Sequence, residues 1–115
     1  MTDVMSCEKA LERFTEILLN LYNCSQRYNA IMCWLRLLLK DIESFTFYDE
    51  YDYKKKIFPI LSSAWARTNI ILAGKCDSHQ HSTTSFSENV RAVKTSYQML
   101  EILSFSDQER AEKVQ

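Results

Sequence analysis

The segment Cys76–His81 carries the side chains that come closest to a metal site in this sequence. It reads Cys-Asp-Ser-His-Gln-His and offers a thiol and two imidazoles, which are ligands that zinc prefers in a tetrahedral set. A further ligand would have to come from elsewhere, such as Cys24 or Cys33. Because no second ligand pair with finger-like spacing occurs, we expect a polar loop here, with a metal site as the alternative, and we expect no cofactor.

His79 or His81 could also serve as the base of a nucleophilic site. Such a site needs a serine or cysteine held against the histidine and a backbone turn that stabilises the developing charge. The chain has one glycine, Gly74, so the sequence offers neither a glycine-rich oxyanion turn nor a phosphate-binding loop. We therefore expect no enzymatic activity and no small-molecule substrate.

The basic run Lys54–Lys56 follows the acidic run Asp49–Asp52. Lysines beside tyrosines suit nucleic acid, because bases stack on aromatic rings while cations hold the phosphates. The adjacent acids lie within one Debye length and offset most of this positive charge. They also precede the lysines by four residues, a spacing that suits ion pairs on one helix. With a formal net charge of −1, the chain is not expected to bind nucleic acid.

Glycine and proline each occur once in 115 residues, at Gly74 and Pro59. Turns between strands depend on these two residue types, so their scarcity predicts helices joined by few connections. Hydrophobic residues make up 46% of the chain, which is enough for one core. We expect an all-α fold: a small helical bundle in which a long N-terminal helix, or a helical hairpin, packs against two further helices. It would form one domain over residues 1–105, with a polar tail at 106–115.

Apolar residues recur at alternating steps of three and four from Val4 to Ile42. The pattern keeps one heptad phase, as in a coiled coil, and Ser25 is its one clearly polar member. A single helix would be about 60 Å long. A hairpin turning within Asn20–Gln26, a stretch of weaker helix formers, is the alternative. The continuous phase favours the long helix, whose apolar part Ile31–Leu39 would be a pillar buried on all sides.

The C-terminal half predicts the other two helices. Pro59 lies either in the first turn of a helix or at a kink in one that began near Asp49. This helix should end at the glycine that opens the polar loop Gly74–Thr84. Ser85 and Glu88 then fit a capping box at the start of the last helix.

The N-terminal half of the long helix would expose an apolar stripe that two shorter helices cannot cover. An exposed stripe of this size marks a protein-binding surface. We therefore expect a non-enzymatic subunit or adaptor of an intracellular multiprotein complex, with other subunits or a second copy as partners. The hairpin alternative would bury the same stripe internally. The expected partner-binding residues are Leu11, Phe14, Leu18, Leu21, Tyr48 and Tyr51.

A metal- or nucleic-acid-binding module that uses the Cys76–His81 loop or the Lys54–Lys56 patch is the second functional hypothesis. The four cysteines follow no signal-peptide pattern, so we expect reduced thiols and an intracellular location in the cytoplasm or nucleus. The most apolar run, Ile31–Leu39, contains Arg36 and is too short to cross a bilayer, so no membrane span is expected.

Overall fold

All regular secondary structure in the described part of the chain is helical. The structure, a computed structural model, describes residues 4–76 and 84–114. Because no strand occurs in these two ranges, the expectation of an all-α fold is confirmed. In chain order the elements are α1 (Val4–Cys24), α2 (Asn29–Glu43), α3 (Glu50–Asp52), the π-helical turn η1 (Tyr53–Ile57), α4 (Phe58–Cys76), α5 (Thr84–Ser104) and α6 (Asp107–Val114).

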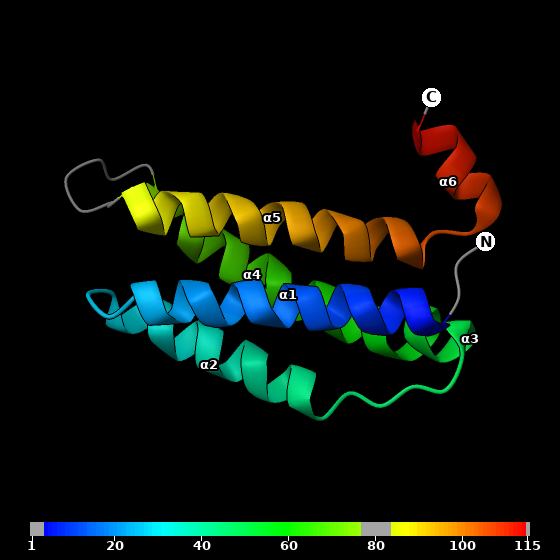
Figure 1. Ribbon diagram of the computed structural model, residues 1–115, viewed down its shortest axis with the longest axis horizontal. Helices are drawn as coiled ribbons and strands as arrows, with labels where there is room; N and C mark the ends of the chain where they lie inside the picture. The colour runs from blue at the N-terminus through cyan, green and yellow to red at the C-terminus, as the bar shows by residue number, and fades with distance from the viewer. Residues whose placement is uncertain (1–3, 77–83, 115) are drawn as a thin grey trace.

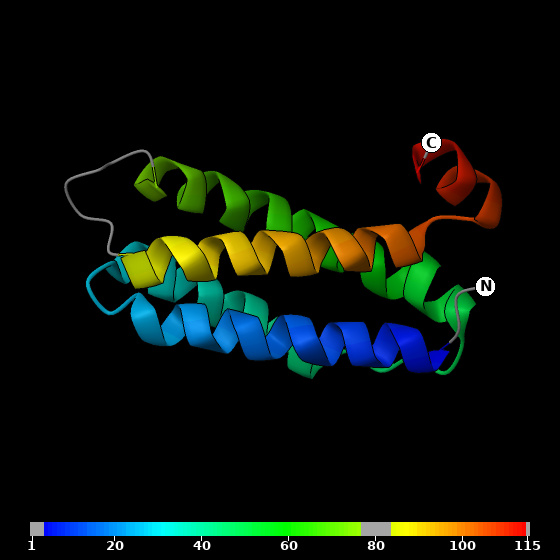
Figure 2. The ribbon, with the colours of Figure 1, turned by 45° about the horizontal axis from the view of Figure 1, so that its top comes forward.

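The long helices of these ranges, α1, α2, α4 and α5, form an up-down-up-down bundle (Figure 1). α1 packs most extensively on α5 and also on α2, while α4 packs on α2 and on α5. Figure 2 shows α1 and α5 side by side along most of their length. Each long helix therefore has two main neighbours, and the bundle is flat, with extents of 43 × 33 × 19 Å.

The prediction of one continuous N-terminal helix is wrong, and the hairpin alternative is confirmed. α1 ends at Cys24 and the chain reverses within residues 25–28, so that α2 runs back along α1 (Figure 1). The apolar stripe is thereby divided between two antiparallel helices. Its members on α1 face the core of a single copy of the chain.

Ser25 explains how the heptad phase survives the turn. Its side chain is fully buried, and its hydroxyl donates a hydrogen bond of 2.6 Å to the carbonyl of Leu21, one of the groups left open at a helix end. The Ser25 amide donates to the Tyr22 carbonyl at 3.1 Å, and the Tyr28 amide donates to the Ser25 carbonyl at 2.9 Å. The backbone of the turn therefore advances nearly as a helix does, and the apolar stripe continues on α2 in the same heptad phase.

α2 is an outer helix rather than the buried pillar predicted from its composition. Ile31, Leu35 and Leu38 are buried, but Cys33 is exposed and Leu37 is 53% exposed. Its main neighbours are α1 and α4, which cover one side of it. Although α2 has apolar residues on all sides, one side of the helix is buried and the other is exposed.

Aromatic rings form a continuous path through the core. Successive ring centroids are 5.1–6.1 Å apart, within the range in which aromatic pairs attract. The path joins α1, α4 and α5 to the segment that follows α2, and it holds that segment against the bundle. In order, the rings are Phe14, Trp65, Tyr97, Phe58, Tyr53 and Phe47.

The helix that precedes Pro59 widens before it reaches the proline. The Phe58 amide donates to the carbonyl of Tyr53, five residues earlier, which is the bond of a π-helix. Pro59 follows this turn inside the helical run, and the wider turn makes room for a ring that would otherwise clash with the carbonyl of Lys55, four residues earlier. Both positions considered for Pro59 are partly correct, because the helical run begins at Glu50 and the wide turn accommodates the proline.

Helix ends in the second half differ slightly from the predictions. α4 passes Gly74 and continues to Cys76, so the expected end at this glycine is wrong; Gly74 has no positive φ and needs no glycine-specific backbone. The remainder of the predicted loop, 77–83, lies outside the described residues. α6 occupies most of the segment 106–115 that was expected to be a polar tail. No helix in the described ranges is long and apolar enough to cross a lipid bilayer.

Candidate functional site

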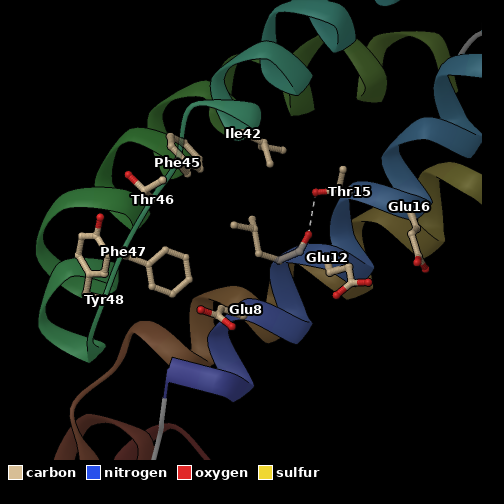
Figure 3. A pocket seen from close by; sticks show the side chains of 10 residues that line it. Glu8, Glu12, Thr15, Glu16, Ile42, Phe45, Thr46, Phe47 and Tyr48 are labelled. Atoms are coloured by element: carbon tan, nitrogen blue, oxygen red, sulfur yellow. Dashed lines mark hydrogen bonds between the residues drawn. The ribbon is translucent and has the colours of Figure 1, made fainter.

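An open apolar groove of about 600 Å³ lies between the N-terminal half of α1 and the chain that follows α2 (Figure 3). Leu11 and Ile42, each 8% exposed, line it from the core side. One wall is the surface of α1, and the other is the segment Phe45–Tyr48. We call this feature the α1 groove. Its volume is in the range of protein ligand sites, although it is open along its length.

The groove exists because α2 is shorter than α1 and diverges from it. The two helices meet at the turn 25–28 and separate toward the other end (Figure 1). α2 ends where the amide and hydroxyl of Ser44 both donate to the carbonyl of Asp41, at 3.1 and 2.7 Å. The chain then continues without regular structure to Asp49. The N-terminal half of α1 therefore has α5 on one side and no helix on the side of the groove.

Three glutamates, Glu8, Glu12 and Glu16, line the α1 wall at a spacing of four residues. This spacing places them in one row on the helix, about 12 Å long along the axis. All three are exposed. Arg13 contacts Glu16 at 3.9 Å on the open surface, whereas within the described residues Glu8 and Glu12 form no ion pair. The row gives the groove a negative edge.

Aromatic side chains form the opposite wall. Phe47 points across the groove toward α1, and its ring packs on Tyr53 at 5.7 Å (Figure 3). Tyr48 is 86% exposed beside it. The Tyr48 amide donates to the Asp52 carboxylate at 3.2 Å, and this bond, with the contact to Lys56, holds the pKa of Asp52 below its ordinary value. The wall is thus fixed from behind, while Tyr48 stays open to a partner.

The predicted partner-binding residues fall into three environments. Tyr48 lines the α1 groove, whereas Tyr51 is 64% exposed and does not line it. The four residues of the α1 stripe lie in the core, and only one of them also reaches the groove. The apolar stripe for which these residues were predicted to bind a partner is buried within a single copy of the chain. The α1 groove lies beside the stripe and is exposed to solvent. These four buried residues are Leu11, Phe14, Leu18 and Leu21, of which Leu11 reaches the groove.

The basic patch and the histidine-bearing loop form no site in the described part of the chain. Lys54 pairs with Glu50 at 3.8 Å, and Lys56 pairs with Asp52 at 3.3 Å, so the charge of two of the three lysines is offset by the same helical run. In the Cys76–His81 loop, only the backbone of Cys76 is described. Among the described residues, no three His, Cys, Asp or Glu side chains are grouped for a metal ion.

A second groove, of about 520 Å³, lies between α1 and α5. Small side chains such as Ala10 and Ala92 line it, and charges of both signs border it, including Arg91 and Glu88. A smaller hollow of about 220 Å³ between α2 and α4 is likewise bordered by an arginine and an aspartate. Neither combines one sign of charge with a wall of aromatic residues, so the α1 groove has the best-defined chemistry.

Of the residues that line the groove, Leu11 and Tyr48 were predicted from the sequence to bind a partner. The other residues that line it were not predicted. The four-residue spacing from Glu8 to Glu16 and the aromatics of Phe45–Tyr48 are both visible in the sequence. Their position opposite each other is not, because it depends on the reversal at 25–28, which brings the end of α2 back beside the start of α1.

Comparison with known proteins finds no relative of this chain: no family model, curated protein or solved structure matches it significantly. The α1 groove itself is therefore the basis for assigning a function.

Proposed function

We propose that this protein is a non-enzymatic helical subunit or adaptor of an intracellular multiprotein complex, and that it binds another protein chain in the α1 groove. The observation that carries the proposal is the open apolar groove with Tyr48, 86% exposed, at its wall. Tyrosine and phenylalanine are enriched in protein interfaces, where rigid aromatic side chains act as anchors. The interaction role expected of the N-terminal stripe is thereby assigned to the groove beside it.

The polar groups of the groove support binding rather than catalysis. The groove's polar side-chain groups are glutamate carboxylates, threonine hydroxyls and the phenol of Tyr48, and the hydroxyl of Thr15 already donates to the carbonyl of Leu11 at 2.8 Å. Histidine, cysteine and lysine are absent from the described residues that line the groove. A nucleophilic site needs a nucleophile held against a base, and the lining supplies no such pair.

Among the described residues, the thiols of Cys24 and Cys33 are free, and they support the intracellular part of the proposal. Free thiols persist in the reducing cytoplasm and nucleus, whereas secreted domains of this size usually oxidise them to disulfides. The proposed partner is a different protein chain. The alternative occupant, a second copy of this chain, is distinguished by the mass of the complex.

The native mass of the tagged full chain in cell extracts tests the proposal, with Tyr48→Ser as the groove variant and Tyr51→Ser as its matched control. Both tyrosines are exposed and three residues apart, so neither change should alter folding by more than about 0.5 kcal/mol. We expect the wild type and Tyr51→Ser to elute in a complex well above 13.6 kDa. Tyr48→Ser should elute mainly as the free chain, because loss of an anchor weakens an interface more than tenfold.

Two results would contradict the proposal. One is a complex that survives Tyr48→Ser unchanged, and the other is a wild-type chain that elutes at its own mass. A complex with twice the mass of the chain, made only of this protein, would replace the partner protein with a second copy.

A further inference from the structure

We infer that the α1 groove takes a basic amphipathic helix of the partner protein, with Lys or Arg at every fourth position facing the glutamate row. This inference rests on the proposed function and adds the chemistry of the partner. It combines three features of the groove: the negative α1 edge, the apolar base and the aromatic wall.

The glutamate row is unfavourable for α1 on its own. Like charges four residues apart repel on a helix surface, and Glu8, Glu12 and Glu16 place two such pairs in sequence. Arg13 offsets only Glu16, across 3.9 Å and on an exposed surface. Cations from a partner would relieve this repulsion along the whole row. The charge of the α1 edge therefore selects a basic partner over an acidic or neutral one.

The apolar base and the aromatic wall favour cations that have long aliphatic stems. Lys and Arg lay their stems on apolar surface and keep the charged head at its edge. Leu11 and Ile42 provide that surface, and the glutamates lie where the heads would end. The face of Phe47, which points toward α1 (Figure 3), can also attract a cation. A simple inorganic cation would use the carboxylates and leave the apolar base uncovered.

A helix fits this groove better than an extended peptide. Every backbone amide of a helix interior is satisfied within the helix. The α1 wall offers side chains, and on the opposite wall the amides of Phe45 and Tyr48 are already bonded. An extended strand would therefore find free amides on that wall at Thr46 and Phe47 alone. The α1 groove opens where α2 has ended. An added helix would pack on the N-terminal half of α1 there, as α2 packs on α1 near the turn. Residues four apart on the added helix are about 6 Å apart along its axis, which matches the spacing of the glutamates.

Fluorescence anisotropy with a designed peptide tests this inference on the full chain. The probe is a labelled helix of about 16 residues, long enough to hold helical structure, with Lys at every fourth position and Leu beside each Lys. The acidic counterpart carries Glu in place of every Lys. A third peptide carries a central Pro in the basic sequence, which breaks the helix and keeps the charge.

The protein variant for this test is the double change Glu8→Lys with Glu12→Lys, and its matched control is Glu101→Lys on α5. All three glutamates are exposed, so the variants should fold as the wild type does. We expect the basic peptide to bind the wild type saturably and the double variant at least about tenfold more weakly. The double variant should in turn bind the acidic peptide better than the wild type does. Glu101→Lys should change the affinity less than about threefold.

Three results would overturn the inference: equal binding of the basic and acidic peptides, an equal loss of affinity in Glu101→Lys, or undiminished binding of the proline peptide. The inference and the proposed function fail separately. If Tyr48→Ser dissociates the cellular complex but the basic peptide does not bind, the groove remains a docking site and the inference of a basic helix is wrong. If the basic peptide binds but Tyr48→Ser leaves the cellular complex intact, the proposed function is wrong.

Discussion

At the scale of single residues, Tyr53 links the groove to the core. It has no exposed surface, and its hydroxyl donates to the carbonyl of Leu100 on α5 at 2.5 Å. The π-helical turn that precedes Pro59 begins at this tyrosine, and Phe47 of the groove wall packs on its ring. Tyr53 therefore ties the segment after α2 to the opposite side of the bundle.

Tyr53 also predicts a loss of stability in alkaline solution. Burial raises the pKa of its hydroxyl well above the ordinary value of about 10, and burial raises the pKa of Tyr97 as well. The unfolded chain loses these protons near pH 10 while the folded chain keeps them. Stability should thus be complete below about pH 10 and fall above it, by up to about 1.4 kcal/mol per pH unit for the fully buried phenol of Tyr53.

Urea unfolding between about pH 8 and pH 11 measures this fall. Tyr53→Phe removes one titrating group and should make the alkaline fall shallower. Tyr51→Phe, at an exposed position, should leave the slope unchanged. Equal slopes in Tyr53→Phe and the wild type would mean that the phenol of Tyr53 is hydrated in the folded state.

At the scale of elements, α1 is a core helix along one side and a groove wall along another. Its apolar side meets α5 and α2, while the glutamate row lies on the side from which α2 diverges. These two roles predict opposite consequences for substitutions on the same helix. Changes on the core side should affect folding, and changes on the groove side should affect binding.

Phe14→Ala tests the core side of α1. Phe14 is fully buried and its ring contacts Trp65 at 5.8 Å and Tyr97 at 6.2 Å, so its truncation should cost about 3–5 kcal/mol of unfolding free energy. Leu19→Ala, on the same helix at a position that is 45% exposed, should cost less than about 0.5 kcal/mol. Urea unfolding of the isolated chain gives both values. A stable Phe14→Ala monomer would mean that α1 packs elsewhere than in this core.

The sequence predicted the helices better than it predicted their arrangement. Scarce Gly and Pro indicate helices, and the acids before Lys54–Lys56 mark a helix start that does form two ion pairs. The continuous helix was preferred to the hairpin because the backbone of the turn at 25–28 keeps a near-helical step, which leaves the heptad phase intact. The sequence does carry one signal for the turn: Ser25 is the polar residue within the stripe, and its hydroxyl caps the end of α1.

At the scale of the whole molecule, the described helices α1, α2, α4 and α5 form a bundle with an open corner at the α1 groove. The corner results from two distant features, the reversal at 25–28 and the early end of α2 at Glu43. No local pattern in the sequence encodes their combined effect, so the α1 groove could not be predicted, although two of its residues, Leu11 and Tyr48, were. The apolar stripe itself cannot distinguish a docking surface from a core, because both bury the same residues.

Hydrogen exchange of the full chain, free and within the complex purified from cells, tests the central claim most directly. Within the described chain, the amides of Thr46 and Phe47 have no hydrogen-bond partner and should exchange quickly in the free protein. In the complex, exchange of residues 44–49 should slow at least about tenfold, while α1 stays protected and the turn 25–28 is unchanged. Unchanged exchange at 44–49, or faster exchange along α1 as its stripe opens toward the partner, would contradict docking in the groove.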